Sequence, residues 1–169
     1  NAVKVELKKK GANENIEYQY VVCDPQDKVK VLLSFLRSQK ENRGLIFCNT
    51  KAAAQTLSKQ LQSKNIATDA LEGDMKQKER DKVMRAFKNE KLQILVSTDV
   101  AARGIDVKGL AYVVHYQVPE HLEYFTHRSG RTGRAGNKGL SLCMIDEKEI
   151  ARIRFYEKNL GIRMTEIKD

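Results

Sequence analysis

The arrangement of short apolar runs constrains the fold of this chain more than any other feature. Four runs, at 45–48, 94–96, 111–114 and 140–144, consist almost wholly of apolar residues, and amphipathic stretches separate them. Such runs suit strands that are covered on both faces, as in a parallel sheet between two helix layers. We expect the helices at 51–64, 76–89, 120–126 and 147–160, so the pattern predicts an α/β fold with a mostly parallel sheet flanked by helices on both faces.

The N-terminal part divides into two segments of different composition. Residues 1–15 contain a run of three lysines followed by glycine, which is typical of a linker or basic arm. Residues 16–22 alternate apolar with polar side chains, which predicts a half-exposed strand, and Asp24 and Pro25 then provide an N-cap and a first-turn proline for a helix. A length of 169 residues favours one domain, which we place at 16–169.

Composition restricts the classes of partner and the compartment. Lys and Arg number 31 against 22 Asp and Glu, a net charge of +9 that favours a polyanionic partner such as nucleic acid. The three cysteines are far apart without zinc spacing, so we expect no metal site and reduced thiols in a cytoplasmic protein. No apolar run approaches the roughly 20 residues that span a bilayer, so we expect no membrane partner.

The most unusual stretch is 124–136, in which Arg128, Arg131 and Arg134 recur every third residue beside His127. No carboxylate occurs between Glu123 and Asp146, so these guanidinium groups lack local counter-ions. If the helix continued to residue 134, the side chains at 127, 131 and 134 would share one face and could clamp an anion. The alternative is an exposed basic helix end whose arginines pair with distant acids.

Two polar clusters directly follow predicted strands. Thr50 follows the first run and is suited to cap the next helix, whose N-terminus could also bind phosphate. The segment 97–106 begins with a hydroxyl pair that includes Thr98 and ends in Arg103-Gly104-Ile105-Asp106. It could donate to phosphates at one end and accept from ribose hydroxyls at the other. The alternative is a solvated loop in which Arg103 pairs with Asp99 or Asp106.

A third cluster lies at the start of the predicted 76–89 helix. Gln77 and Arg80 are one helical turn apart, and Asp74 is the expected cap. An arginine at a helix start opposes the helix dipole and favours a nearby anion, although a surface Gln and Arg often have no special role.

Together these segments resemble the second, C-terminal RecA-like domain of DEAD-box ATP-dependent RNA helicases, over about residues 16–167. The resemblance rests on motifs IV, QxxR, V and VI, which correspond here to Leu45-Ile46-Phe47-Cys48-Asn49-Thr50, Gln77-x-x-Arg80, 97–106 and 127–134. It implies a three-layer RecA-like fold and a protein that couples ATP binding and hydrolysis to local unwinding of RNA duplexes.

The resemblance also implies roles for individual residues. Arg131 and Arg134 would be arginine fingers that reach the γ-phosphate of ATP, and His127 would bridge to the partner domain. Asp106 would accept from the ATP ribose, and Gly104 would let the backbone come close. The RNA-backbone track would be lined, independently of base sequence, by Thr50, Gln77, Arg80, Thr98 and Arg103.

Departures from the family pattern limit what this chain can do alone. Gln117 stands where the family commonly has an aspartate, and Gly-x-Gly-Lys-Thr and Asp-Glu-Ala-Asp are absent. ATP and Mg²⁺ would therefore be held mainly by an N-terminal RecA-like domain that is not in this chain. We expect the chain by itself to be inactive as an ATPase. Two alternatives stay open: a stand-alone RNA- or partner-binding module without catalysis, and a helicase that acts on DNA.

Overall fold

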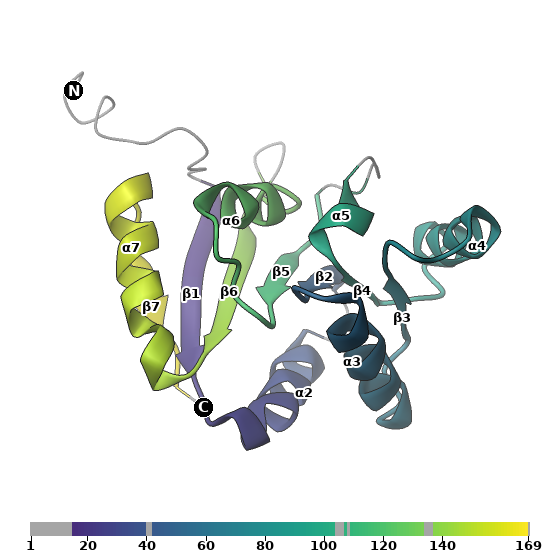
Figure 1. The fold of residues 1–169 in the computed structure, drawn as a ribbon, viewed down its shortest axis with the longest axis horizontal. Coiled ribbons are helices and arrows are strands. Elements are labelled where there is room, and N and C mark those ends of the chain that lie inside the picture. The colour runs from purple at the N-terminus through teal and green to yellow at the C-terminus, as the bar shows by residue number, and fades with distance from the viewer. Residues whose placement is uncertain (1–14, 40–41, 104–106, 108, 134–136, 169) are drawn as a thin grey trace.

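The computed structural model describes residues 15–39, 42–103, 107, 109–133 and 137–168. Within these ranges the strands form one sheet of seven, all parallel, in the order β3-β4-β2-β5-β6-β1-β7 (Figure 1). The strands are β1 (Ile16–Val22), β2 (Gly44–Phe47), β3 (Thr68–Leu71), β4 (Ile94–Ser97), β5 (Tyr112–His115), β6 (Gly139–Ile145) and β7 (Met164–Glu166). The predicted fold class is confirmed. The predicted basic arm, apart from Asn15, lies outside the described residues.

Helices cover both faces of this sheet. They are α2 (Lys28–Ser38), α3 (Lys51–Ser63), α4 (Gln77–Lys88), α5 (Asp99–Ala102), α6 (Leu122–Ser129) and α7 (Ile150–Leu160), with the 3₁₀ turns η1 (Pro25–Asp27) and η2 (Glu147–Glu149). The cores show which helix lies on which face: α2 and α3 pack on the side chains of Ile46 and Val96, whereas α4 packs on those of Leu45 and Leu95. The helices α6 and α7 form a further cluster around Tyr156. The chain therefore has three layers.

The alternation at 16–22 predicts a strand correctly, but it does not indicate which strands lie on either side of it. In β1, Tyr18 and Tyr20 are buried and Glu17 is exposed, as the pattern indicates. The strand pairs with β6 on one side and β7 on the other, so it lies inside the sheet. Residues 25–27 form a 3₁₀ turn before α2, with Asp24 at the N-cap position and Pro25 in the first turn as predicted, although the Asp24 side chain makes no capping hydrogen bond.

Side chains form hydrogen bonds with main-chain groups of both edge strands of the sheet. On β3, Gln62 donates from Nε2 to the Thr68 carbonyl at 2.8 Å, and the Asp69 carboxylate accepts from the Ala70 amide at 2.9 Å. On β7, the Glu157 carboxylate accepts from the amide of Met164 at 2.9 Å. The outermost strands therefore present fewer free hydrogen-bonding groups than bare edge strands would.

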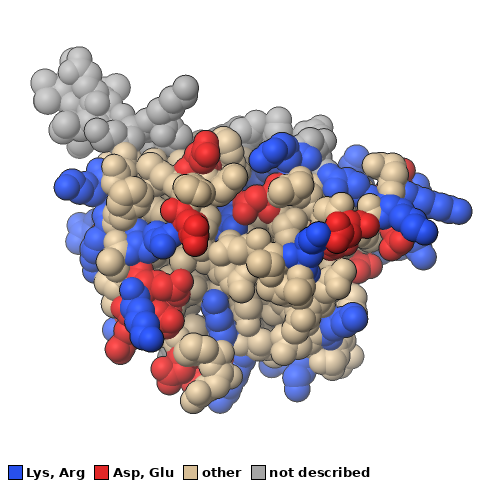
Figure 2. All heavy atoms as spheres, in the orientation of Figure 1, with Lys and Arg blue, Asp and Glu red and all other residues tan. Residues whose placement is uncertain are grey.

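The surface charge is spread rather than gathered on the face seen in Figure 2. Lysines and arginines alternate there with acids around the rim, and the centre is largely uncharged. Among the described helices, none has both the length and the apolar character that a bilayer crossing requires.

Candidate functional site

The polar clusters predicted from the sequence meet at one edge of the sheet. The parallel strands β2, β4 and β5 all end there, and each is followed by polar residues: Asn49 and Thr50, Thr98 and Asp99, and Gln117. This is the edge where ligands bind in open α/β sheets. The helix α6 carries His127 and Arg128, and α6 and α5 both lie along the upper side of the ribbon in Figure 1.

Arg128 is the centre of this edge. Its side chain is 1% exposed, and its Nε and Nη2 donate to the two carboxylate oxygens of Asp99, each at 2.8 Å. Nη1 donates to the Gln117 carbonyl at 2.8 Å, Nη2 also donates to Asn49 Oδ1 at 2.7 Å, and the guanidinium lies over the Phe47 ring. The guanidinium therefore joins the ends of three strands.

This finding corrects the sequence reasoning about Arg128. The sequence indicated that this arginine lacks a local counter-ion, with pairing to a distant acid as the alternative, and that pairing is observed: Asp99, 29 residues upstream, is its partner, although the guanidinium is buried and not exposed. The same acid was one of two partners considered for Arg103 in the alternative interpretation of segment 97–106, whereas the structure pairs it with Arg128. Gln117 participates through its backbone, and its side-chain oxygen accepts from the Asn49 amide at 2.7 Å. The missing aspartate at this position thus leaves no gap in the described network.

His127, Arg131 and Arg103 line a small common cavity. Its volume is about 50 Å³, and the rest of the lining comes from Phe47, Asp99, Ala102, Tyr124 and Arg128. Arg131 is half-buried, and its guanidinium donates to the carbonyl of Ala102 at 2.9 Å and to that of Val107 at 3.4 Å. Both carbonyls belong to the segment that follows β4, so motif VI and motif V are in direct contact.

The shared helical face that we considered for residues 127, 131 and 134 does not form, because the helix does not continue that far. The helix α6 ends at Ser129 with Gly130 as its C-cap, and the Thr132 hydroxyl then donates to the Leu110 carbonyl. Gly133 has φ +68°, in the left-handed region that glycine adopts readily. His127 and Arg131 therefore meet through a tight turn instead of a helical face. Arg134, Gly104 and Asp106 lie outside the described residues.

The predicted RNA-binding residues lie on three helix starts and on the end of α5. Thr50 caps α3 by accepting from the Ala53 amide at 3.1 Å, and the buried Thr98 caps α5 by accepting from Ala101 at 3.4 Å. Arg103 is exposed, and no hydrogen bond joins its guanidinium to another described residue. The alternative pairing of Arg103 with Asp99 is thus not observed.

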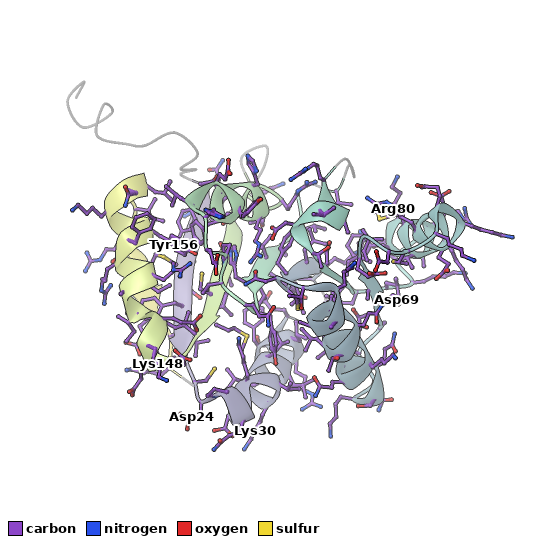
Figure 3. The ribbon with its side chains drawn as sticks, in the orientation of Figure 1. Asp24, Lys30, Asp69, Arg80, Lys148 and Tyr156 are labelled. Carbon is purple, nitrogen blue, oxygen red and sulfur yellow. The ribbon has the colours of Figure 1, made fainter. Side chains whose placement is uncertain are left out.

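The QxxR pair divides between two environments. Arg80, labelled in Figure 3, donates to the Ala101 carbonyl at 2.5 Å and so links α4 to α5. Gln77 is exposed and donates to the Asp81 carboxylate on its own helix at 2.8 Å. The predicted cap is wrong: Lys76 is the N-cap of α4, and Asp74 instead forms an ion pair with Lys51 at 2.6 Å. That ion pair connects the start of α3 to the loop before α4.

A series of hydrogen-bonded polar side chains is buried beneath α6 and was not predicted from the sequence. His115 is fully buried, its Nε2 lies 2.8 Å from Ser141 Oγ, and Ser141 Oγ lies 2.9 Å from Ser129 Oγ. Burial, assisted by the positive charge of Arg128, lowers the pKa of His115 well below its usual range, so the ring is neutral. The sequence indicates this buried group only through Ser141, a polar residue within an otherwise apolar run.

Known proteins provide an independent comparison. The family model described as "Helicase conserved C-terminal domain" matches residues 27–136. The ATP-dependent RNA helicase FAL1 of Saccharomyces cerevisiae is 42% identical over 148 residues, which cover 86% of this chain and 37% of FAL1. The probable ATP-dependent RNA helicase MJ0669 of Methanocaldococcus jannaschii is 38% identical over 156 residues, which cover 92% of this chain and 42% of that protein.

Solved structures agree with the sequence comparison. The C-terminal domain of the DEAD-box protein Dbp5 superposes with a TM-score of 0.83 at 30% identity, covering 92% of this chain and 91% of that domain. S. cerevisiae Dbp5 bound to RNA and ADP BeF3 gives a TM-score of 0.86 at 30% identity, covering 93% of this chain and 43% of Dbp5. The chain spans about two-fifths of the length of the curated relatives it matches, 37–42% among those compared. The matched family model, the motif order and the superposed domains agree, and the chain belongs to the helicase conserved C-terminal domain family as a C-terminal RecA-like domain of the DEAD-box type.

Proposed function

We propose that this chain is the second half of an ATP-dependent RNA helicase, in which it works with an N-terminal RecA-like domain to couple ATP hydrolysis to local unwinding of RNA duplexes. The cavity at the motif VI turn carries the proposal. It is lined by His127, Arg103 and Arg131, yet its volume of about 50 Å³ holds only a few water molecules. A cationic surface of this kind suits a nucleotide that is bound mainly by another domain.

Arg131 is the proposed contributor to phosphoryl transfer in this chain. The carbonyls of Ala102 and Val107 orient its guanidinium beside the cavity. Phosphoryl transfer requires positive charge on the equatorial oxygens of the transferred group, and an arginine finger supplies about 10³ to 10⁵ in rate. We assign the same role to Arg134, contact with the partner domain to His127, and contact with the ATP ribose to Asp106, with Gly104 allowing close approach.

We assign Mg²⁺ to the N-terminal domain. In the described parts of this chain, no three His, Cys, Asp or Glu side chains gather as a metal ion would require. The sequence also lacks the phosphate-loop lysine and the acidic motif that hold Mg²⁺ and ATP in such enzymes. This chain would therefore supply the cationic residues of the site, and the other domain would supply the metal-binding acids.

We further propose that Thr50, Gln77, Arg80, Thr98 and Arg103 form the RNA-backbone track. The exposed Arg103 and the start of α3, where Thr50 adjoins Lys51, offer donors to phosphates. Arg80 acts there by holding α5 in place through the Ala101 carbonyl. Backbone contacts of this kind predict binding that is independent of base sequence and weakens with salt. Three buried free thiols support a reducing compartment, for which we propose the cytoplasm.

The test uses the full-length protein that contains this chain. We expect ATPase activity stimulated by single-stranded RNA more than by DNA of the same sequence, and loss of at least about 10³ in kcat on Arg131→Lys, because lysine lacks the planar fork. Arg152→Lys is the matched control, since Arg152 donates to the Pro119 carbonyl and neither residue lines the cavity. Unchanged turnover in the Arg131 variant, or Mg²⁺-dependent turnover by the 169-residue chain alone, would contradict the proposal.

A further inference from the structure

We infer that Arg128 is a positioning residue that couples RNA binding to nucleotide binding. Its guanidinium and its three partners, Asp99, Asn49 and Gln117, are named here the junction. The inference rests on the proposed function and extends it, because no ligand contact was assigned to any junction residue.

Sequence adjacency connects the junction to both proposed ligand surfaces. Asn49 immediately precedes Thr50, and Asp99 immediately follows Thr98, so two of the junction's acceptors are next to proposed RNA contacts. Arg128 immediately follows His127, which lines the cavity. Thr50, Thr98 and His127, three of the proposed ligand contacts, are therefore each one residue away from a junction residue.

The geometry of the junction is specific to arginine. A guanidinium presents five donors in a fixed plane, and four of them are used here: one edge meets both oxygens of Asp99, and two further donors reach Asn49 and the Gln117 backbone. The guanidinium side of these bonds is shielded from solvent, because the Arg128 side chain is 1% exposed, whereas that of Asp99 is 22% exposed. A lysine would keep the charge but could not hold three segments in one plane.

This arrangement gives the two surfaces a shared rigid element. A shift of Thr50 or Thr98 toward bound RNA moves Asn49 or Asp99, and the planar fork passes that shift to α6 and to His127. Coupling of this kind is reciprocal: RNA strengthens nucleotide binding by the same factor by which nucleotide strengthens RNA binding. A typical coupling changes affinity by about 5- to 150-fold.

The coupling factor is the measurement that tests the inference. In the full-length protein, the dissociation constant of ADP–beryllium fluoride is measured with and without a saturating single-stranded RNA, and the ratio is the factor. We expect Arg128→Lys and Asp99→Asn each to reduce the factor by about tenfold, and the double variant to reduce it no further, because both act on one interaction. Arg152→Lys makes the same chemical change outside the junction and is expected to keep the wild-type factor.

The outcomes separate a coupling role from a purely structural one. The coupling factor is a ratio of two affinities of the same variant. A variant that is merely less stable therefore binds nucleotide more weakly but keeps the wild-type coupling factor. An unchanged coupling factor in the junction variants would overturn the inference. Asp99→Asn preserves shape and decides the question if Arg128→Lys does not fold. If RNA does not change the nucleotide affinity of the wild-type protein, the proposed function and this inference are both overturned. If RNA changes the nucleotide affinity of the wild type and of the variants by the same factor, the inference alone is overturned.

Discussion

Acid should destabilise this domain through one buried imidazole. His115 is fully buried, its Nε2 is bonded to Ser141, and its ring stacks on Phe125 at a centroid distance of 4.9 Å. Its Nδ1 has no hydrogen-bond partner in the described part of the structure. Burial, together with the nearby charge of Arg128, keeps the folded-state pKa well below the ordinary value of 6.5. The folded protein therefore resists protonation of this ring.

The sign and size of the effect follow from proton linkage. Below pH 6.5 the unfolded chain binds a proton at this position and the folded chain does not, so the free energy of unfolding falls as the pH falls. The slope for one such group approaches about 1.4 kcal/mol per pH unit, and the loss between pH 7.5 and pH 5.0 is about 2 kcal/mol. The loss stops growing only when the pH reaches the folded-state pKa.

Urea unfolding at a series of pH values measures this loss. His115→Gln is the reference, because glutamine places an amide near the Nε2 position but does not titrate. The difference in unfolding free energy between the wild type and this variant cancels the contributions of the carboxylates and of the other two histidines. We expect that difference to shift against the wild type by about 2 kcal/mol from pH 7.5 to pH 5.0. A difference that does not vary with pH would refute the assignment of a neutral buried imidazole.

Three further predictions concern stability and reactivity. Gly44→Ala should lower the free energy of unfolding by at least about 1–3 kcal/mol, because the new Cβ would lie 2.1 Å from the Tyr112 ring. Gly73→Ala is the control and should be nearly neutral, because its Cβ would meet nothing nearer than 3.9 Å. Equal denaturation midpoints for the two variants would contradict this prediction. Asp146→Ala should cost about 1 kcal/mol in the same assay by removing the capping box with Glu149 before α7, and Glu147→Ala serves as the control. Burial raises the pKa of the Cys48 thiol to about 12, so labelling of native protein by a thiol reagent should be as slow as global unfolding, and rapid labelling would show that the site opens locally.

The sequence was sufficient for most of the fold because the sheet is buried on both faces. The four apolar runs correspond to β2, β4, β5 and β6, and no end is shifted by more than one residue. The strands β3 and β7 were not predicted: β3 has four residues and begins Thr68-Asp69, and β7 is Met-Thr-Glu. Such segments become strands through pairing with β4 and β1, which local composition does not reveal.

The sequence indicated which residues make up the candidate site, but only part of how they are arranged. Motif residues such as His127, Arg103 and Arg131 meet at one cavity, which agrees with the resemblance, although their ligand roles stay predictions. The pairing of Arg128 with Asp99 was not predictable, because it joins residues 29 positions apart and either could have paired elsewhere. The helix end at Ser129 depends equally on tertiary structure, since the bond from Thr132 to Leu110 draws the chain away from the helix axis.

The side chains at the two outermost strands bear on how this domain behaves in a crowded solution. A parallel sheet ends in amides and carbonyls that another copy could extend into a continuous ribbon. Here Gln62 and Asp69 engage such groups on β3, and Glu157 engages one on β7. Three ordinary polar residues thus discourage polymerisation from either end of the sheet.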